Sequence, residues 1–390
     1  MLGAVTHSTA RRLDGFGTTI FAEMSALAAR TGAINLGQGF PDTGGPAALL
    51  ERARTAIAGG DNQYAPGQGV SPLREAIARH QQRHYGIALD PDRQVVVTTG
   101  ATEAIAAAVL GLVDPGDEVI VFEPFFDSYV AMVQMAGAVP KPVTLRVPDF
   151  RLPVEELRAA VGPRTRAILV NSPHNPTGAL LTDGELAVLA EVACEHDLVV
   201  ISDEVYEHLT FDGVRHRSLG SVPGLADRTV VVSSAGKTFS VTGWKVGWAT
   251  GPADLVGAVL SAKQWLSYSS GTPFQGAVAW ALEHVGDFVA GLRADLQSQR
   301  DLLCDGLGEV GFTVYRPQGT YFATTDIRPL GFADGLDFCR RLPDLAGVVA
   351  IPQQVLHLDP ERGRPFVRWA FCKRSDVIKE ALERLGKLRG

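Results

Sequence analysis

The chain has 390 residues, of which 46% are hydrophobic and 20% are charged, and its formal net charge at pH 7 is −7. A chain of this length and composition can bury a large core, and we expect one large domain with a smaller one beside it. Because the net charge is negative and the basic residues are scattered, we expect no nucleic-acid partner and no membrane partner.

The N-terminal stretch and the cysteines favour a cytoplasmic protein. MLGAVTHSTARR lacks the basic-then-apolar order of a signal peptide, and the apolar run AIAAAVLGLV is too short to span a bilayer. The four cysteines (Cys194, Cys304, Cys339 and Cys372) are far apart, and none belongs to a C-x-x-C motif. We therefore expect reduced cysteines, no disulfide framework and no metal site.

The first 285 residues divide into an arm and a large domain. Residues 1–45 form an N-terminal arm that belongs in part to the small domain, with the helical pattern TIFAEMSALAAR followed by the turn-rich INLGQGFPDTGG. From 46 to 285, helical segments alternate with six apolar runs: QVVVTTG, EVIVFEP, AILVNSP, LVVISDE, TVVVSSA and VGWATGP. Nearly continuous Val and Ile runs are typical of strands buried on both faces, which predicts a parallel or mostly parallel sheet.

Residues 286–390 are predicted to form a smaller α+β domain. The long helical pattern VAWALEHVGDFVAGLRADLQSQRDLLCDGL leads into it, and GTYFATTDI, GVVAIP and FVRWAFC are predicted to contain its short strands.

The stretch SSAGKTFSVTGWKVGW contains a Gly-Lys-Thr that fits two unrelated chemistries. A phosphate-binding P-loop requires G-x-x-x-x-G-K-[ST], but Val231 stands at the position of the first glycine. A helix should also begin at Thr238, yet the residues that follow make a poor first helical turn. The P-loop is therefore disfavoured, and a covalent role for Lys237 needs support from the rest of the chain.

That support comes from the residues that follow the apolar runs, because ligands of open α/β sheets bind beyond the carboxyl ends of the strands. A Gly-Ala-Thr at 100–102 opens a helix, whose N-terminus suits an anion. The other strand ends supply an aromatic pair, an amide, a carboxylate, a phenol and an amine: Phe125 and Phe126, Asn175, Asp203, Tyr206 and Lys237. A G-x-G-x-x-G motif is absent, so a dinucleotide fold is not supported. This combination suits pyridoxal 5′-phosphate, which has an aldehyde, a ring nitrogen, a phenolic oxygen, a flat ring and a phosphate.

The ordered motifs GATEA, EPFFDSY, NSPHNPTG, SDEVY, SSAGKTFSVTGWKVGW and FVRWAFCK resemble those of class I, fold-type I pyridoxal-phosphate-dependent aminotransferases. The resemblance covers nearly the whole chain, and it is to the branch that contains kynurenine, methionine and actinobacterial N-succinyldiaminopimelate aminotransferases. It implies an α/β fold with a mostly parallel seven-stranded sheet in the large domain. It also implies ping-pong transfer of an amino group between an L-amino acid and a 2-oxo acid such as 2-oxoglutarate.

The resemblance implies roles for the residues around the cofactor ring. Lys237 would bind the cofactor covalently and then move the substrate proton. Asp203 would pair with the pyridine nitrogen, while Asn175 and Tyr206 would hydrogen-bond to the phenolic oxygen. Phe126 would stack on the ring. A helix N-cap for Asp203 and a plain core position for Phe126 stay open as alternatives.

The resemblance also implies how the phosphate is held. Its proposed ligands are Gly100, Ala101 and Thr102 at the helix start, together with Ser234 and Lys245. Lys245 stands where many relatives have arginine, which keeps the charge but loses the bidentate fork. Tyr64, in DNQYAPGQG, matches a tyrosine that reaches the phosphate of the neighbouring subunit, so a homodimer with shared active sites is implied.

The substrate site is expected to have two parts: residues that bind the α-carboxylate, which all amino acids share, and residues that contact the substrate side chain. Arg368, with Asn175 and the backbone of Gly37, would bind the substrate α-carboxylate. Ile20 stands where kynurenine-type members have a tryptophan, and LSYSSGTPF adds Tyr268, Ser269 and Ser270. These polar groups favour N-succinyl-LL-2,6-diaminopimelate, a donor in lysine biosynthesis, whereas methionine, glutamine or kynurenine remain alternatives.

Two other kinds of function stay open. One is a cysteine-conjugate β-lyase that uses the same Lys237 and Asp203 on the same fold. The other is a non-enzymatic cofactor-binding module of a regulator, which is disfavoured because no helix-turn-helix or basic segment is found. We also expect cis peptide bonds at Glu123-Pro124 and Asn175-Pro176, where the chain turns sharply after a strand.

Overall fold

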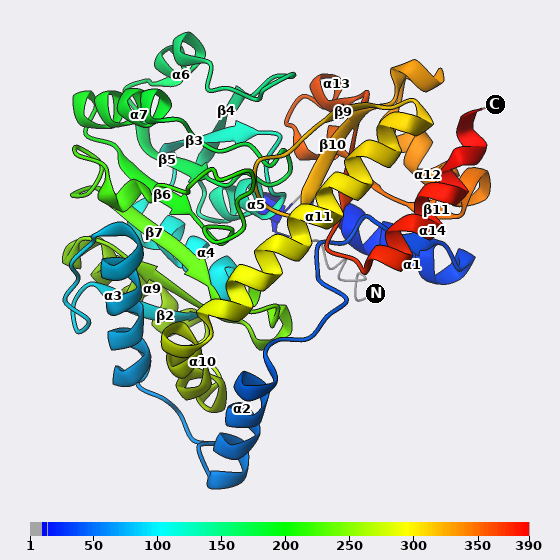
Figure 1. Cartoon of the computed structure of the whole chain (residues 1–390). Coiled ribbons are helices and arrows are strands. Elements are labelled where there is room, and N and C mark those ends of the chain that lie inside the picture. Colours follow the sequence, from blue (N-terminus) through cyan, green and yellow to red (C-terminus); the bar gives the residue numbers. More distant parts are fainter. Residues whose placement is uncertain (1–9, 14, 390) are drawn as a thin grey trace, which may run out of the picture.

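A computed structural model describes residues 10–13 and 15–389 (Figure 1). Most of the N-terminal stretch MLGAVTHSTARR, which lacks the order of a signal peptide, therefore lies outside the described residues. No helix within the described ranges is long and apolar enough to cross a membrane.

The largest sheet has seven strands in the order β2-β8-β7-β6-β5-β3-β4. All pairings are parallel except those of β8, which runs antiparallel to β2 and to β7. In chain order the strands are β2 (Val95–Thr99), β3 (Glu118–Glu123), β4 (Val139–Thr144), β5 (Thr165–Asn171), β6 (Val199–Asp203), β7 (Thr229–Ser234) and β8 (Val246–Thr250). This confirms the mostly parallel seven-stranded α/β fold, and each of the six apolar runs overlaps one of these strands.

The seventh strand, β4, was missed because its sequence, VPKPVT, is not a run of β-branched residues. It lies at the edge of the sheet, and among the described residues its one strand partner is β3. An edge strand tolerates proline because one row of its backbone groups needs no partner in the ladder.

Helices cover both faces of this sheet, which explains why its strands are apolar throughout (Figure 1). On one face lie α4 (Gly100–Leu112), α5 (Ser128–Met135) and α9 (Ala253–Leu266), which share a core with alternate strand residues such as Val121 and Ile201. The other face is covered by α2 (Ala47–Gly59), α3 (Ser71–Tyr85), α6 (Val154–Ala160), α7 (Asp183–Glu195) and α10 (Thr272–His284).

A second, four-stranded antiparallel sheet has the order β12-β13-β10-β9. Its elements are β9 (Thr313–Tyr315), β10 (Phe322–Asp326), β12 (Ile351–Pro352) and β13 (Phe366–Ala370), with the helices α11 (Gly286–Val310), α12 (Gly335–Ala346) and α14 (Ser375–Leu385) around it. The predicted helix over 278–307 is in fact two helices, α10 and α11, which meet at Val285. In Figure 1, α11 runs obliquely from beside the large sheet to the smaller one.

The N-terminal arm joins the core of the smaller sheet. Its helix α1 (Ile20–Thr31) is capped by Thr19, whose side chain accepts a hydrogen bond from the backbone of Ala22. Strand β1 (Ile34–Asn35) pairs in parallel with β11 (Val348–Val349). Met24 and Leu36 are fully buried in the same apolar cluster as residues of α11 and β13, so the arm is held against the C-terminal part of the chain.

The predicted cis peptide bonds are confirmed at Glu123-Pro124 and Asn175-Pro176, and two further ones occur at Val147-Pro148 and Ser172-Pro173. The four cysteines form no disulfides, and three of them are buried.

Candidate active site

A cavity of about 350 Å³ lies beyond the carboxyl ends of the parallel strands, between the large sheet and the smaller one. The strand ends of the large sheet supply Gly100, Phe126, Asn175, Asp203 and Lys237. The remaining walls come from the arm and from the smaller sheet, namely Phe21, Gln38, Gly39, Phe40, Phe322 and Arg368. The site therefore lies where the topology of an open α/β sheet places it.

Lys237 lies in the short helix α8 (Ala235–Thr238), directly after β7. Its Nζ donates a hydrogen bond of 2.7 Å to the Tyr321 hydroxyl and lies 5.5 Å from the ring centre of Tyr206. Burial lowers the pKa of this amine to about 8. A lysine whose pKa is lowered toward 7 is a far better nucleophile than an exposed lysine, because a larger fraction of its amine is unprotonated at pH 7.

Asp203 ends β6 and lies at the base of the cavity. Its Oδ2 accepts a 2.6 Å hydrogen bond from the Tyr129 hydroxyl, and its Oδ1 accepts one of 3.2 Å from the backbone of Val205. Burial raises the pKa of Asp203 to about 6, and the bond from Tyr129 opposes that rise. The carboxylate thus bonds to the turn that follows it and lines the cavity, but the helix N-cap alternative is wrong, because the described residues that directly follow Asp203 form no helix.

The start of α4 forms a cradle for an anion. The side chain of Thr99, the residue before this helix, makes no capping bond to it, and Gly100 has a φ of 74°, which favours glycine. A Cβ placed on Gly100 would lie 3.1 Å from Lys245 Nζ, and one on Gly247 would lie 2.5 Å from the carbonyl carbon of Gly100. The absence of a side chain at both glycines therefore leaves room for an anion between the helix N-terminus and the Lys245 ammonium. Ser234 lines the same cavity.

Arg368, on β13, is a buried cation with incomplete pairing. Its Nη1 donates to Asn175 Oδ1 at 3.1 Å and its Nη2 donates to the carbonyl of Gly37 at 2.8 Å. The rings of Phe322 and Phe21 flank the guanidinium at 4.0 and 4.9 Å. Burial lowers its pKa to about 10, so it stays charged at pH 7, and its Nε has no partner within the described part of the chain. Such a group calls for an anion in the cavity.

Most of the predicted site residues meet in this one cavity: Gly100, Ala101, Thr102, Phe126, Asn175, Asp203, Tyr206, Ser234, Lys237, Lys245 and Arg368. Gly37 joins them through its bond to Arg368. Four others do not line the cavity of this chain: Ile20, Tyr64, Tyr268 and Ser269.

These four residues lie in two places. Ile20 precedes Phe21, and it is Phe21 that lines the cavity. Tyr64 is 84% exposed and makes an edge-to-face contact with the half-exposed Tyr268, with ring centres 5.6 Å apart. Ser269 donates a 3.0 Å hydrogen bond to the carbonyl of Ala65.

Two tyrosines of the site, Tyr129 and Tyr321, were not predicted from the sequence. Tyr129 hydrogen-bonds to Asp203, and Tyr321 hydrogen-bonds to Lys237. Tyr129 lies in the motif EPFFDSY, three residues after Phe126, so a one-turn helical spacing could have pointed to it. Tyr321 accepts from Lys237 and donates a 2.5 Å hydrogen bond to the carbonyl of Gly39. It is 84 residues from Lys237, and no local pattern marks it.

The residues present fit pyridoxal 5′-phosphate. The cavity offers an amine for an aldehyde, a buried carboxylate for a ring nitrogen, and an uncapped helix with a lysine for a phosphate. Arg368, a buried cation on the wall of the same cavity, suits a carboxylate of the second reactant. Fold and site together define a pyridoxal-phosphate-dependent enzyme of fold type I.

Comparison with known proteins gives the family. The sequence model for aminotransferase class I and II matches residues 31–385. The chain is 55% identical to a probable N-succinyldiaminopimelate aminotransferase of Mycobacterium tuberculosis, over 97% of this chain and 98% of that protein. It is 41% identical to a methionine aminotransferase of Escherichia coli, over 97% of each chain. The solved structure of the N-succinyldiaminopimelate aminotransferase from Mycobacterium tuberculosis superposes with a TM-score of 0.96, covering 98% of this chain and all of that one.

The chain therefore belongs to the class I and II aminotransferase family. It is a pyridoxal-phosphate-dependent enzyme that transfers an amino group between an amino acid and a 2-oxo acid.

The lowered pKa of Lys237 predicts how cofactor capture depends on pH. Only the neutral amine can attack the aldehyde, so covalent attachment to cofactor-free protein should accelerate by about tenfold per pH unit below the pKa of about 8 and then level off. Stopped-flow absorbance after mixing with pyridoxal phosphate measures this rate. A rate that keeps rising to pH 10 would instead indicate an ordinary lysine.

Proposed function

We propose that the protein transfers the amino group of N-succinyl-LL-2,6-diaminopimelate to 2-oxoglutarate, a step of lysine biosynthesis. The observation that carries amino-acid binding is the buried guanidinium of Arg368, which lines the cavity that also holds Lys237 and stays charged at pH 7. The choice of donor is supported by the 55% identity to a probable N-succinyldiaminopimelate aminotransferase. The polar stretch 268–270 also supports it.

Lys237 and Asp203 are proposed to carry the chemistry. Pyridoxal phosphate supplies an electron sink for negative charge that develops at the substrate Cα. Lys237 Nζ would first hold the cofactor and, once displaced by the substrate amine, would take the Cα proton and return it on the cofactor side. Asp203, ionised and held by Tyr129, would keep the ring nitrogen protonated, which maintains the sink.

The remaining residues of the cavity would position the ring and the phosphate. Asn175 and Tyr206 would donate to the phenolic oxygen, and Phe126 would lie against the ring face. The backbone of Ala101 and Thr102, the Ser234 hydroxyl and the Lys245 ammonium would bind the phosphate: these groups surround the cradle at the start of α4.

The enzyme is proposed to act as a homodimer in which Tyr64 reaches the phosphate of the neighbouring site. In support, an apolar surface lies beside Tyr64, with Trp265 84% exposed and Leu266 and Tyr268 about half exposed. A monomeric protein rarely leaves a cluster of large apolar side chains in water. A two-fold dimer would cover this surface and bring Tyr268 and Ser269 near the partner's cavity.

A complementation experiment tests the shared site. Chains carrying Lys237→Ala and chains carrying Tyr64→Ala, co-assembled at limiting cofactor, should recover about one quarter of wild-type activity, because half of the dimers are mixed and each has one intact site. The matched control combines Lys237→Ala with Asp203→Asn: these residues belong to the same chain's site, so no activity should return. Recovery in the control, or a monomer mass in sedimentation, would contradict the arrangement.

Half-reaction kinetics over a panel of donors test the substrate. Absorbance of the cofactor should report the fastest conversion with N-succinyl-LL-2,6-diaminopimelate, ahead of methionine, glutamine and kynurenine. Ser269→Ala and Tyr268→Phe should lower kcat/KM for the succinylated donor by roughly 3- to 10-fold, the equivalent of one hydrogen bond, and change methionine little. If methionine or kynurenine leads the panel in the wild-type enzyme, the donor assignment is wrong.

A further inference from the structure

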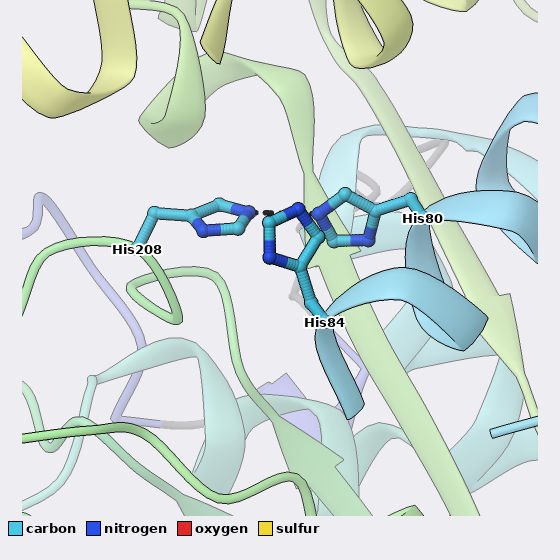
Figure 2. A group of neighbouring side chains, drawn as sticks. All are labelled: His80, His84 and His208. Atoms are coloured by element: carbon cyan, nitrogen blue, oxygen red, sulfur yellow. Dashed lines mark hydrogen bonds between the residues drawn. The ribbon is translucent and has the colours of Figure 1, made fainter. Parts of the chain in front are cut away.

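Three histidines meet outside the active-site cavity. His80 and His84 lie one turn apart on α3, and His208 lies on the segment that follows β6. Figure 2 shows the three rings converging, with His80 Nε2 and His208 Nε2 2.8 Å apart. One nitrogen from each ring can be chosen so that all three lie within 4.8 Å of one another. This cluster, His80, His84 and His208, plays no part in the chemistry proposed above.

The spacing of these nitrogens suits a tetrahedral metal ion. Ligands about 2.0–2.1 Å from zinc at tetrahedral angles lie roughly 3.3 Å from one another, so only small rotations of the rings are needed. Two histidines four residues apart on one helix face form a common zinc-binding pair.

Two buried polar atoms, one on His80 and one on the neighbouring Glu207, have no hydrogen-bond partner among the described residues. These atoms are His80 Nδ1 and Glu207 Oε2. The other carboxylate oxygen of Glu207 accepts a 2.5 Å bond from Ser233. A buried carboxylate with one unpaired oxygen, next to His208 in sequence and lining the same cavity, offsets part of a divalent charge.

A cavity of about 840 Å³ gives access to the cluster. His80, His84 and His208 line it together with Arg83 and Glu207. It is distinct from the active-site cavity, although the two share a wall: Tyr206 lines the active site, whereas Glu207 and His208 line the second cavity. There is room for water as a fourth ligand, as in zinc sites with three protein ligands.

We propose that His80, His84 and His208 bind a zinc ion, with a fourth position open to solvent. The ion would link α3 to the segment after β6, which carries Tyr206 on its other side, and so would brace the wall of the active site from behind. This site stands independently of the substrate assigned above.

Equilibrium dialysis of the tag-free holoenzyme against Zn²⁺, followed by metal analysis, tests the proposal. The wild type should bind one zinc per chain. Because losing an outer-shell partner already costs about 10- to 100-fold in metal affinity, losing a ligand through His84→Asn or His208→Asn should weaken binding by at least about 100-fold. His84 is exposed, so this change should not disturb folding. His196→Asn, an exposed histidine outside the cluster, is the matched control and should bind like the wild type.

Thermal unfolding gives a second readout. Zinc should raise the Tm of the wild type and of His196→Asn, because a ligand that binds only the folded state stabilises it, and should leave His84→Asn and His208→Asn unchanged. The cofactor absorbance of each variant verifies that it has folded. Zinc binding that is equal in the wild type and in the two ligand variants, or absent from the wild type, would overturn the proposal.

Discussion

Lys237→Ala should abolish transamination. Proton transfer alone contributes about 10²- to 10⁴-fold to a typical rate, and this substitution also removes covalent attachment, so we expect kcat to fall by more than about 10⁴-fold. The phosphate cradle at Gly100 and Lys245 is untouched, so the variant should still bind pyridoxal phosphate without a covalent bond. Borohydride reduction followed by mass spectrometry should fix the cofactor on Lys237 in the wild type and leave the variant unlabelled.

Lys379→Ala is the matched control, because Lys379 is an exposed lysine on α14. This variant should be labelled with the cofactor on Lys237 and should catalyse transamination at the wild-type rate. Substantial transamination by Lys237→Ala, or labelling of another lysine in the wild type, would show that the catalytic amine lies elsewhere.

Arg368→Ala should lower kcat/KM for every amino donor by a similar factor. The α-carboxylate is common to all donors, and its two charge-assisted hydrogen bonds contribute about 1.5–3 kcal/mol each. Their loss corresponds to roughly a 100- to 10⁴-fold decrease at about 1.4 kcal/mol per tenfold. Half-reaction kinetics with the panel of donors used for Ser269→Ala measure both the size of the loss and its uniformity.

The control for this experiment is Arg374→Ala, an exposed arginine that pairs with Asp376 close to the end of β13. Its kcat/KM should stay near the wild-type value. Arg368→Lys should recover only part of the loss, because an ammonium keeps the charge but not the planar fork. A loss confined to one donor would place Arg368 at the variable end of the substrate instead of at its carboxylate.

The sequence by itself determined the large sheet and the edge of it at which the polar residues after its strands meet. Runs such as QVVVTTG and LVVISDE are local signals, since a strand buried on both faces must be apolar throughout. Parallel strands also place their carboxyl ends at one edge, so Gly100, Asp203 and Lys237 were predicted to meet without knowledge of any contact between them. The structure brings these residues into one cavity. What each of them does there stays a prediction.

Only the tertiary structure decided which residues from outside the large sheet complete the site. Tyr321 reaches Lys237, and Gly37 reaches Arg368 across 331 residues of sequence, because the arm and the smaller sheet pack over the strand ends. Nothing in the local sequence records such packing.

The histidine cluster illustrates the same limit. The wide spacing of the cysteines predicts no metal site. His80 and His208 are 128 residues apart, and they meet because α3 packs beside the segment that follows β6. Local patterns follow from backbone geometry and burial within one element, whereas contacts between elements depend on how several hydrophobic faces are covered at once. For this reason the strands and their polar ends could be predicted from the sequence, but the partners of those residues could not.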